Sequence, residues 1–175
     1  MKYFFDCEFI EDGKTIDLIS IGIVADDGRE YYAISTQFNA RKASDWVMDN
    51  VIKQLPIRYP NQYDSPNIKQ QSLAWKSRNQ IRQDILNFCD KAKYGTPEFW
   101  AYYADYDHVV LCQLFGKMID LPKGWPMYTK DVKQLCDSLG NPRLLKQDPS
   151  SEHNALSDAK WTKEAYEYLQ TYETD

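Results

Sequence analysis

The first 38 residues contain three apolar segments that are separated by short turn sequences. Residues 2–10 and 15–25 are rich in aromatic and branched residues that favour strands, and an acidic Asp-Gly turn at 11–14 separates them. A second Asp-Gly turn, at 26–29, precedes a third apolar segment that extends to about residue 38. Strands joined by such short turns pair antiparallel. We therefore expect the chain to begin with a three-stranded antiparallel meander.

Helical and strand-like segments alternate in the rest of the chain. Spacing and capping signals predict helices at 41–55, from Ser72 to about 93, at 106–118, at 130–139 and at 154–172. Strands are expected at 98–103 and 127–129, and loops at 56–71 and 143–152. This order predicts an α/β fold, in which an antiparallel meander and later parallel strands form one mixed sheet flanked by helices. It is the element order of a ribonuclease H-like fold.

Composition and charge limit the class of protein. With 175 residues, of which 43% are hydrophobic, the chain is expected to form a single domain over residues 1–175. The net charge of −5 argues against a protein that coats nucleic acid, but not against an enzyme that binds a strand end locally. No apolar run is long enough to cross a membrane. The four scattered cysteines are typical of a reduced, cytoplasmic protein rather than of a disulfide framework or zinc site.

Two acidic side chains lie inside the first apolar segment. Asp6 and Glu8 are two residues apart, so on a strand both point to the same face. Phe4 and Ile10 fall on that face too, which argues against a solvent-exposed edge. Carboxylates are costly in apolar surroundings unless a cation compensates their charge. We therefore interpret Asp6 and Glu8 as metal ligands.

Further candidates lie in the second half of the chain. Asp105 and Asp107 both follow the strand expected at 98–103, and spacing alone leaves either as a third ligand. Asp158 is five residues after His153, so the two face one point if His153 lies in a loop and Asp158 one turn into the helix. His108 is interpreted as structural or as a substrate contact.

These groups suit metal-dependent hydrolysis of a phosphodiester. Two Mg²⁺ or Mn²⁺ ions would be held by Asp6, Glu8, Asp158 and the acid at 105 or 107. His153 is expected to take the proton of the attacking water, and Glu8 to be catalytic as well as a ligand. The expected product is a nucleoside 5′-monophosphate.

The motifs Asp-x-Glu at residue 6, Tyr-Asp at residue 106 and His-x₄-Asp at residue 153 resemble those of the DEDDh (DnaQ-like) 3′–5′ exonucleases. In that superfamily the third acid follows an aromatic residue, which favours Asp107 over Asp105. Segments 5–13, 18–22, 27–32, 75–78 and 106–114 are similar to those of the RNase AS family. This resemblance implies a homodimeric, metal-dependent 3′–5′ exoribonuclease that acts on the 3′ end of single-stranded RNA and prefers adenylate.

Substrate contacts are expected from residues near the acids and from a basic group. Ile10 and Tyr106 adjoin the acids and are candidates to contact the terminal base, whereas Phe9 is assigned to the core. Trp75 and Arg78 are candidates to contact the substrate, Arg78 through a phosphate. Two alternatives remain open: an exonuclease on single-stranded DNA, and an inactive nucleic-acid-binding module.

Overall fold

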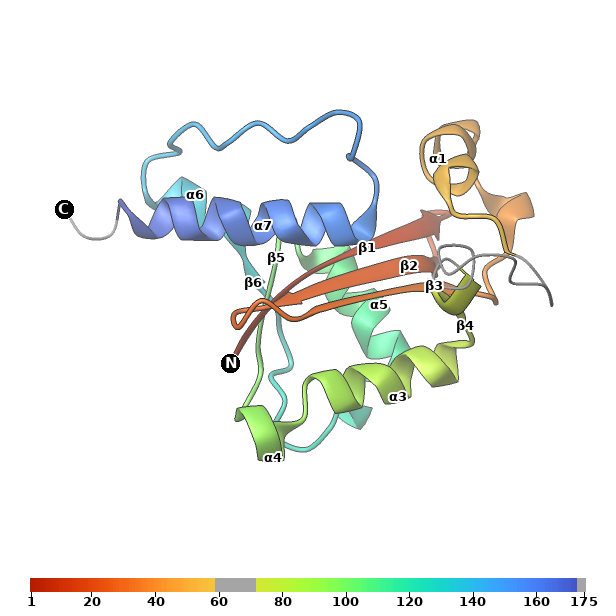
Figure 1. The fold of residues 1–175 in the computed structure, drawn as a ribbon, viewed down its shortest axis with the longest axis horizontal. Coiled ribbons are helices and arrows are strands. Elements are labelled where there is room, and N and C mark those ends of the chain that lie inside the picture. Colours follow the sequence, from red (N-terminus) through yellow and green to blue (C-terminus); the bar gives the residue numbers. More distant parts are fainter. Residues whose placement is uncertain (59–71, 173–175) are drawn as a thin grey trace.

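The computed structural model describes residues 1–58 and 72–172 and contains a six-stranded mixed sheet (Figure 1). Its strands are β1 (Lys2–Glu11), β2 (Ile16–Ala25), β3 (Glu30–Ser35), β4 (Trp75–Lys76), β5 (Glu98–Ala101) and β6 (Lys130–Asp131). Their order across the sheet is β4-β3-β2-β1-β5-β6. The first three strands pair antiparallel, and β4, β5 and β6 each pair parallel to a neighbour. The predicted fold class is therefore confirmed.

Helices cover both faces of this sheet. Helix α7 (Ala155–Gln170) lies along one face, and α3 (Arg78–Phe88) and α5 (Asp105–Phe115) lie on the other (Figure 1). The remaining helical segments are η1 (Ala40–Lys42), α1 (Asp45–Asn50), η2 (Ile52–Gln54), α4 (Lys91–Tyr94), η3 (Met118–Asp120) and α6 (Val132–Ser138). Within the described residues, no helix is both long and apolar enough to cross a membrane.

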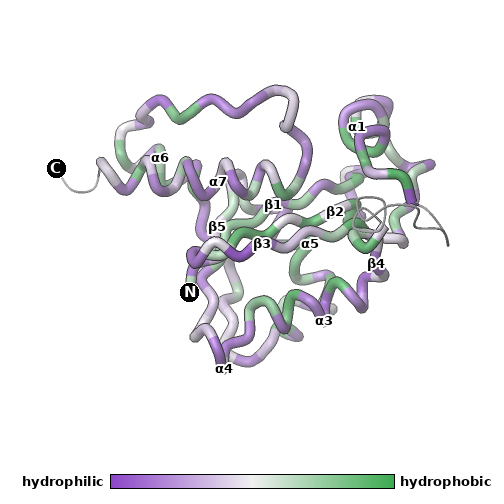
Figure 2. The backbone as a smooth tube through the Cα atoms, in the orientation of Figure 1, coloured by the Kyte–Doolittle hydropathy of each residue, from purple (hydrophilic) through white to green (hydrophobic). Residues whose placement is uncertain are grey.

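The apolar residues of β1 are divided between the two helical layers. Tyr3, Phe5 and Cys7 belong to the hydrophobic cluster that also contains residues of α3 and α5. Phe4 packs in a second cluster with α6 and α7, and Ile10 in a third with α1. Figure 2 shows the hydrophobic colouring concentrated on the central strands. All four cysteines are free and buried, as expected from the sequence.

The helix predicted at 41–55 is divided into three short segments, η1, α1 and η2. Ser44 caps α1, because its side chain accepts a hydrogen bond from the Val47 N–H at 3.2 Å. A cap at this point starts a new helix after η1 rather than continuing one. The third strand also ends early, at Ser35 rather than near residue 38.

The helix predicted from Ser72 to about 93 is interrupted by a strand near its start and divided near its end. Residues 75–76 form β4, which pairs parallel to β3, and the helix α3 starts only after Ser77. Ser77 and Gln80 form a reciprocal capping box that fixes this start. Asp90 then caps α4 as a separate helix. Sequence reasoning chose the wrong serine as the cap.

Two other expectations shift in position. The short strand expected at 127–129 is found at β6, immediately before α6. The strand expected at 98–103 ends at Ala101. Most of the loop expected at 56–71 lies outside the described residues.

Candidate active site

Asp6 and Glu8 project from the face of β1 that carries α7. In the antiparallel pairing Asp6 lies opposite Gly22 and Glu8 opposite Ser20. The register then shifts, so that β2 holds one extra residue, Ile19, between the partners of Glu8 and Phe9. Ile10, two residues after Glu8, is 3% exposed on the same face. The two acids therefore lie between buried apolar residues, as the sequence predicted.

Gly22 lets the start of α7 approach the sheet beside Asp6. A Cβ atom at this position would lie 2.3 Å from the Ala155 carbonyl oxygen and 2.3 Å from the Leu156 nitrogen. No other residue fits this contact without moving the helix. Because α7 starts directly over β2, Asp158 in its first turn is brought to the acids of β1.

Three candidate residues come together at this point. One ligand atom from each of Glu8, His153 and Asp158 lies within 4.8 Å of the others. His153 lies in the loop before α7 with a φ of +65°, and its backbone N–H donates to Asp158 Oδ2 at 3.0 Å. The Gln147 side-chain amide donates to Asp158 Oδ1. The structure thus has His153 in the loop and Asp158 in the first helical turn, the arrangement that their spacing required.

Asp107 reaches the acids from the opposite helical layer. The pairing of β1 with β5 ends at Phe4, so the later N–H groups on this edge of β1 need another acceptor. Asp107, which is 5% exposed, accepts the Cys7 N–H at 2.7 Å. Asp105 is exposed in the first turn of α5. Of the two acids that spacing left open, Asp107 faces β1.

Burial raises the pKa values of all four carboxyl groups, and neighbouring acids raise those of Asp6 and Glu8 further. Burial, followed by the charges of Asp107, Glu8 and Asp158, raises the pKa of Asp6 well above its usual value. Burial and Asp158 raise the pKa of Glu8 to about 8, and burial raises that of Asp107 to about 7. The pKa of Asp158 is also raised, mainly by burial. The cluster therefore holds more negative charge than its surroundings stabilise.

A divalent cation fits this donor set. Among the described residues, no lysine or arginine forms an ion pair with any of the four acids. Carboxylate oxygens are the ligands that Mg²⁺ and Mn²⁺ prefer, and such an ion compensates the buried negative charge. Ligand atoms of Glu8, His153 and Asp158 lie close enough together to bind one ion. Asp6 and Asp107 belong to the cluster because their charges interact with each other and with the other acids.

The predicted substrate contacts Ile10 and Tyr106 differ in their exposure. Ile10 packs with Ile19 and Val51 in the core, whereas Tyr106 is 48% exposed beside Asp107 and contacts the Phe9 ring. Phe9 packs against the core cluster, as expected. The roles of Ile10 and Tyr106 stay predictions.

Trp75 and Arg78 make contacts with residues other than the four acids. Trp75 lies in the edge strand β4, where its Nε1–H donates to the Pro56 carbonyl at 3.0 Å and its ring stacks on Phe38. Arg78 forms an ion pair with Asp17. His108, on α5, makes a 3.0 Å hydrogen bond with Thr129, which supports a structural role. Contact of Trp75 and Arg78 with substrate stays a prediction.

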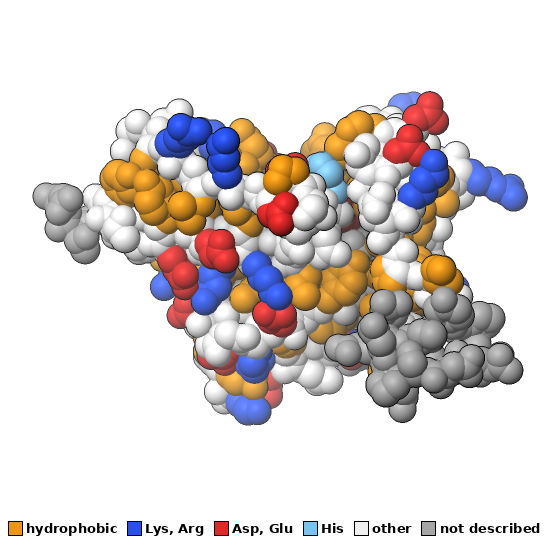
Figure 3. Space-filling model, turned by 45° about the horizontal axis from the view of Figure 1, so that its top comes forward, with side chains coloured by type: hydrophobic (Ala, Val, Ile, Leu, Met, Phe, Trp, Pro, Cys, Tyr) orange, Lys and Arg blue, Asp and Glu red, His pale blue; other side chains and the backbone are white. Residues whose placement is uncertain are grey.

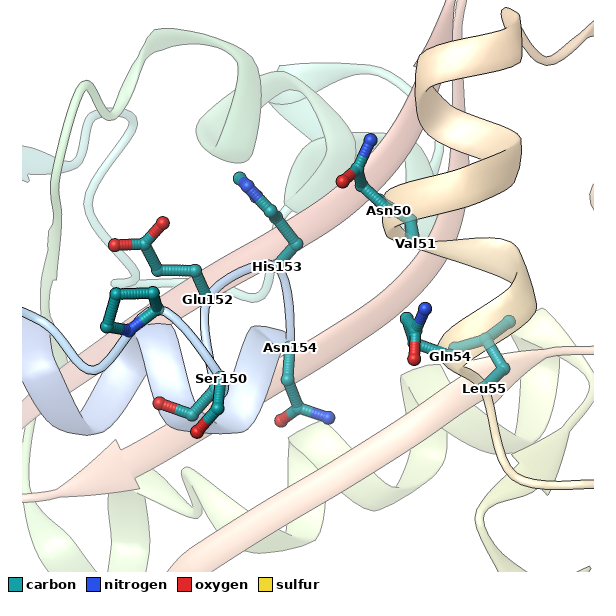
Figure 4. Close-up of a pocket in the computed structure, with 10 residues that line it drawn as sticks. Asn50, Val51, Gln54, Leu55, Ser150, Glu152, His153 and Asn154 are labelled. Carbon is teal, nitrogen blue, oxygen red and sulfur yellow. The ribbon is translucent and has the colours of Figure 1, made fainter.

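A pocket adjoins His153 on the side of α1 and η2. Its volume is about 410 Å³, and its lining includes Asn50, Gln54, Ser150, His153 and Asn154. Asn50 and Gln54 project from α1 and η2 toward the loop that carries His153 (Figure 4). The surface is notched between these two parts of the molecule, and histidine atoms are visible in the notch (Figure 3). The pocket therefore leaves open space beside His153, and none of the four acids lines it.

Sequence reasoning missed three residues that shape the site. Gly22 inside an apolar strand was an available signal of close backbone approach. Gln147, which contacts Asp158 across 11 residues, gave no signal in the local pattern. Trp46, whose ring centroid lies 4.7 Å from that of His153, gave none because that contact joins distant parts of the chain.

Comparison with known proteins places the chain among exoribonucleases. The model of the 3′-5′ exoribonuclease Rv2179c-like domain matches residues 1–170. The chain belongs to this family. Two relatives from strains of Mycobacterium tuberculosis, the 3′-5′ exoribonucleases Rv2179c and MT2234.1, are each 46% identical to it over 160 residues. The match covers 91% of this chain and 88% of each relative. The residues matched by the family model include β1, α5 and α7, the elements that contribute the acids.

Proposed function

We propose that this protein is a metal-dependent 3′–5′ exoribonuclease that releases nucleoside 5′-monophosphates from single-stranded RNA. The observation that carries the proposal is the meeting of Glu8, His153 and Asp158, with Asp6 and Asp107 beside them, in a chain of an exoribonuclease family. The acids come from β1, α5 and α7, three elements that are far apart in the chain.

Each residue has a defined task in this proposal. Asp6, Glu8, Asp107 and Asp158 would hold two Mg²⁺ or Mn²⁺ ions. When bound, such ions activate water and stabilise the charge that develops on the phosphate. His153 accepts the proton of the attacking water at a ring nitrogen. The hydrogen bond from the His153 N–H to Asp158 Oδ2 fixes the loop that carries this base.

The finer assignments rest on the sequence motifs. We propose membership of the DEDDh superfamily, a resemblance to RNase AS and a preference for adenylate. We also propose that the chain forms a single domain, assembles as a homodimer and is located in the cytoplasm.

The decisive experiment compares matched oligomers of RNA and DNA. Purified protein with Mg²⁺ should release nucleoside monophosphates one at a time from the 3′ end of RNA, and excess chelator should stop the release. Asp6→Ala should abolish it, whereas Asp105→Ala, at an exposed acid of the same helix as Asp107, should not. Faster hydrolysis of DNA would replace the RNA assignment, and unchanged release by Asp6→Ala would show that the site is elsewhere.

Homopolymers test the finer claim. Poly(A) should be degraded faster than poly(U) at equal concentrations of 3′ ends. Equal rates on the two polymers would remove the adenylate preference and leave the exoribonuclease assignment intact.

A further inference from the structure

A hydrogen bond fixes the backbone of His153, whereas few interactions orient its imidazole ring. The backbone N–H donates to Asp158 Oδ2, and the φ of +65° turns the chain just before α7. Within residues 1–58 and 72–172, neither ring nitrogen of His153 has a hydrogen bond. The pocket of about 410 Å³ borders this residue (Figure 4). The direction of the imidazole therefore depends on side-chain packing.

Trp46 supplies a packing contact to this ring. The two ring centroids are 4.7 Å apart and the ring planes are inclined by 79°, which is the favourable edge-to-face arrangement. Trp46 is nevertheless 53% exposed, so burial in the core does not account for a tryptophan here. Its contact with His153 gives this side chain a specific place in the structure.

Trp46 is linked through α1 to the strand that carries the acids. It lies in α1, which Ser44 caps, and α1 leads directly to Val51, which is 2% exposed. Val51 packs in one cluster with Ile10 and Ile19, and Ile10 follows Glu8 by two residues on β1. The position of the indole is therefore tied to the strand that carries Glu8.

We propose that Trp46 is a positioning residue for His153: its indole holds the imidazole toward Glu8 and Asp158 and away from the adjoining pocket. The proposal rests on the proposed function, because it concerns the residue assigned there as the base. Trp46 acts through His153 and not through the substrate. Its loss should therefore lower kcat with little change in KM.

A double-mutant cycle tests the proposal on an RNA oligomer and on the same oligomer with an abasic 3′-terminal residue. Trp46→Ala should lower kcat about tenfold on both substrates, since misplacing a catalytic group slows the chemical step. Trp46→Phe, which keeps an aromatic ring, should retain most of the activity. In a His153→Ala background, Trp46→Ala should have no further effect.

Two controls separate positioning from folding. Tyr128→Ala removes an aromatic side chain that is 61% exposed and distant in sequence from α1 and α7, and it should leave kcat unchanged. The shift of the unfolding temperature by Mn²⁺ should be the same in Trp46→Ala as in the unmodified protein.

Other outcomes overturn the proposal. If Trp46→Ala lowered kcat about tenfold in the His153→Ala background as well, Trp46 would act independently of His153. A loss confined to the substrate that has its terminal base would make Trp46 a base contact. Full activity of His153→Ala would show that His153 is not the base. Inactivity of the unmodified protein on RNA would instead refute the proposed function.

Discussion

Asp107 has two roles that can be separated by substitution. Its carboxylate carries charge in the acid cluster, and it also accepts the Cys7 N–H where β1 no longer pairs with β5. A buried N–H without an acceptor costs about 1–3 kcal/mol. The two roles therefore have different consequences when Asp107 is replaced by alanine or by asparagine.

We expect Asp107→Ala to be less stable than Asp107→Asn by about 1–3 kcal/mol, because asparagine keeps an oxygen acceptor for Cys7. Urea unfolding of the metal-free proteins measures the difference. Asp105→Ala, at an exposed position, should change the free energy of unfolding by less than about 0.5 kcal/mol. Equal stability of the two Asp107 variants would mean that the hydrogen bond contributes nothing.

His153 lies within ligand spacing of Glu8 and Asp158, so its role as a base needs a direct test. We expect His153→Ala to keep its affinity for Mn²⁺ and to lose activity by about 10²–10⁴-fold, the usual contribution of a general base. Calorimetric titration with Mn²⁺ and the rate on RNA supply the two measurements. If affinity and rate fall together, His153 is a ligand.

The contact between β2 and α7 makes the site sensitive to one methyl group. Gly22→Ala should destabilise the protein by about 1–3 kcal/mol, as overpacking does. It should also lower activity, because the first turn of α7 carries Asp158. Thermal unfolding and the rate on RNA test both effects.

Gly28→Ala is the matched control for this substitution. Its φ of +87° makes alanine strained, but a Cβ there meets no atom within 4 Å. It should cost about 1 kcal/mol without loss of activity. Similar activity losses in both variants would point to general destabilisation and not to displacement of α7.

The elements that sequence reasoning predicted well have a strong local pattern. The meander is defined by apolar segments and Asp-Gly turns, and α7 by its buried alanines and Leu169 at helical spacing. The elements it misplaced depend on distant partners. β4 and β6 are two residues each, and pairing with β3 and β5 gives them their strand conformation. Local periodicity contains no information about such pairing.

The same distinction applies to the candidate site. Asp6 and Glu8 were proposed because acids in an apolar segment are unusual, His153 and Asp158 because of their spacing, and Asp107 over Asp105 on a family motif. In the structure Glu8, His153 and Asp158 lie within ligand spacing, and Asp6 interacts electrostatically with Glu8, Asp107 and Asp158. Trp46 and Gln147 were missed, since tryptophan and glutamine are unremarkable in their own segments. Their importance comes from contacts made only after the chain has folded.

The stability of the whole molecule should depend on pH in an unusual direction. The raised pKa values mean that the folded, metal-free protein keeps protons between about pH 4 and pH 8 that the unfolded chain has released. The free energy of unfolding should therefore fall as pH rises through this window. Burial lowers the pKa of His108, which acts in the opposite direction, but it is one group against four acids.

Thermal unfolding in chelator between pH 5 and pH 8 measures this effect. The Asp6→Asn, Glu8→Gln double variant should show a flatter dependence, and the stabilisation by added Mg²⁺ should grow as pH rises. Rising stability of the metal-free protein over the same range would contradict the electrostatic description of the cluster.

The distribution of the site along the chain determines when it can assemble. Glu8 belongs to the first strand, whereas His153 and Asp158 accompany the last helix, α7. During translation, the ribosome exposes the first acids long before the final acid and the base have been made. An incomplete chain therefore carries a cluster that lacks two of its parts. The complete cluster can form only after α7 has been made and has packed against Gly22.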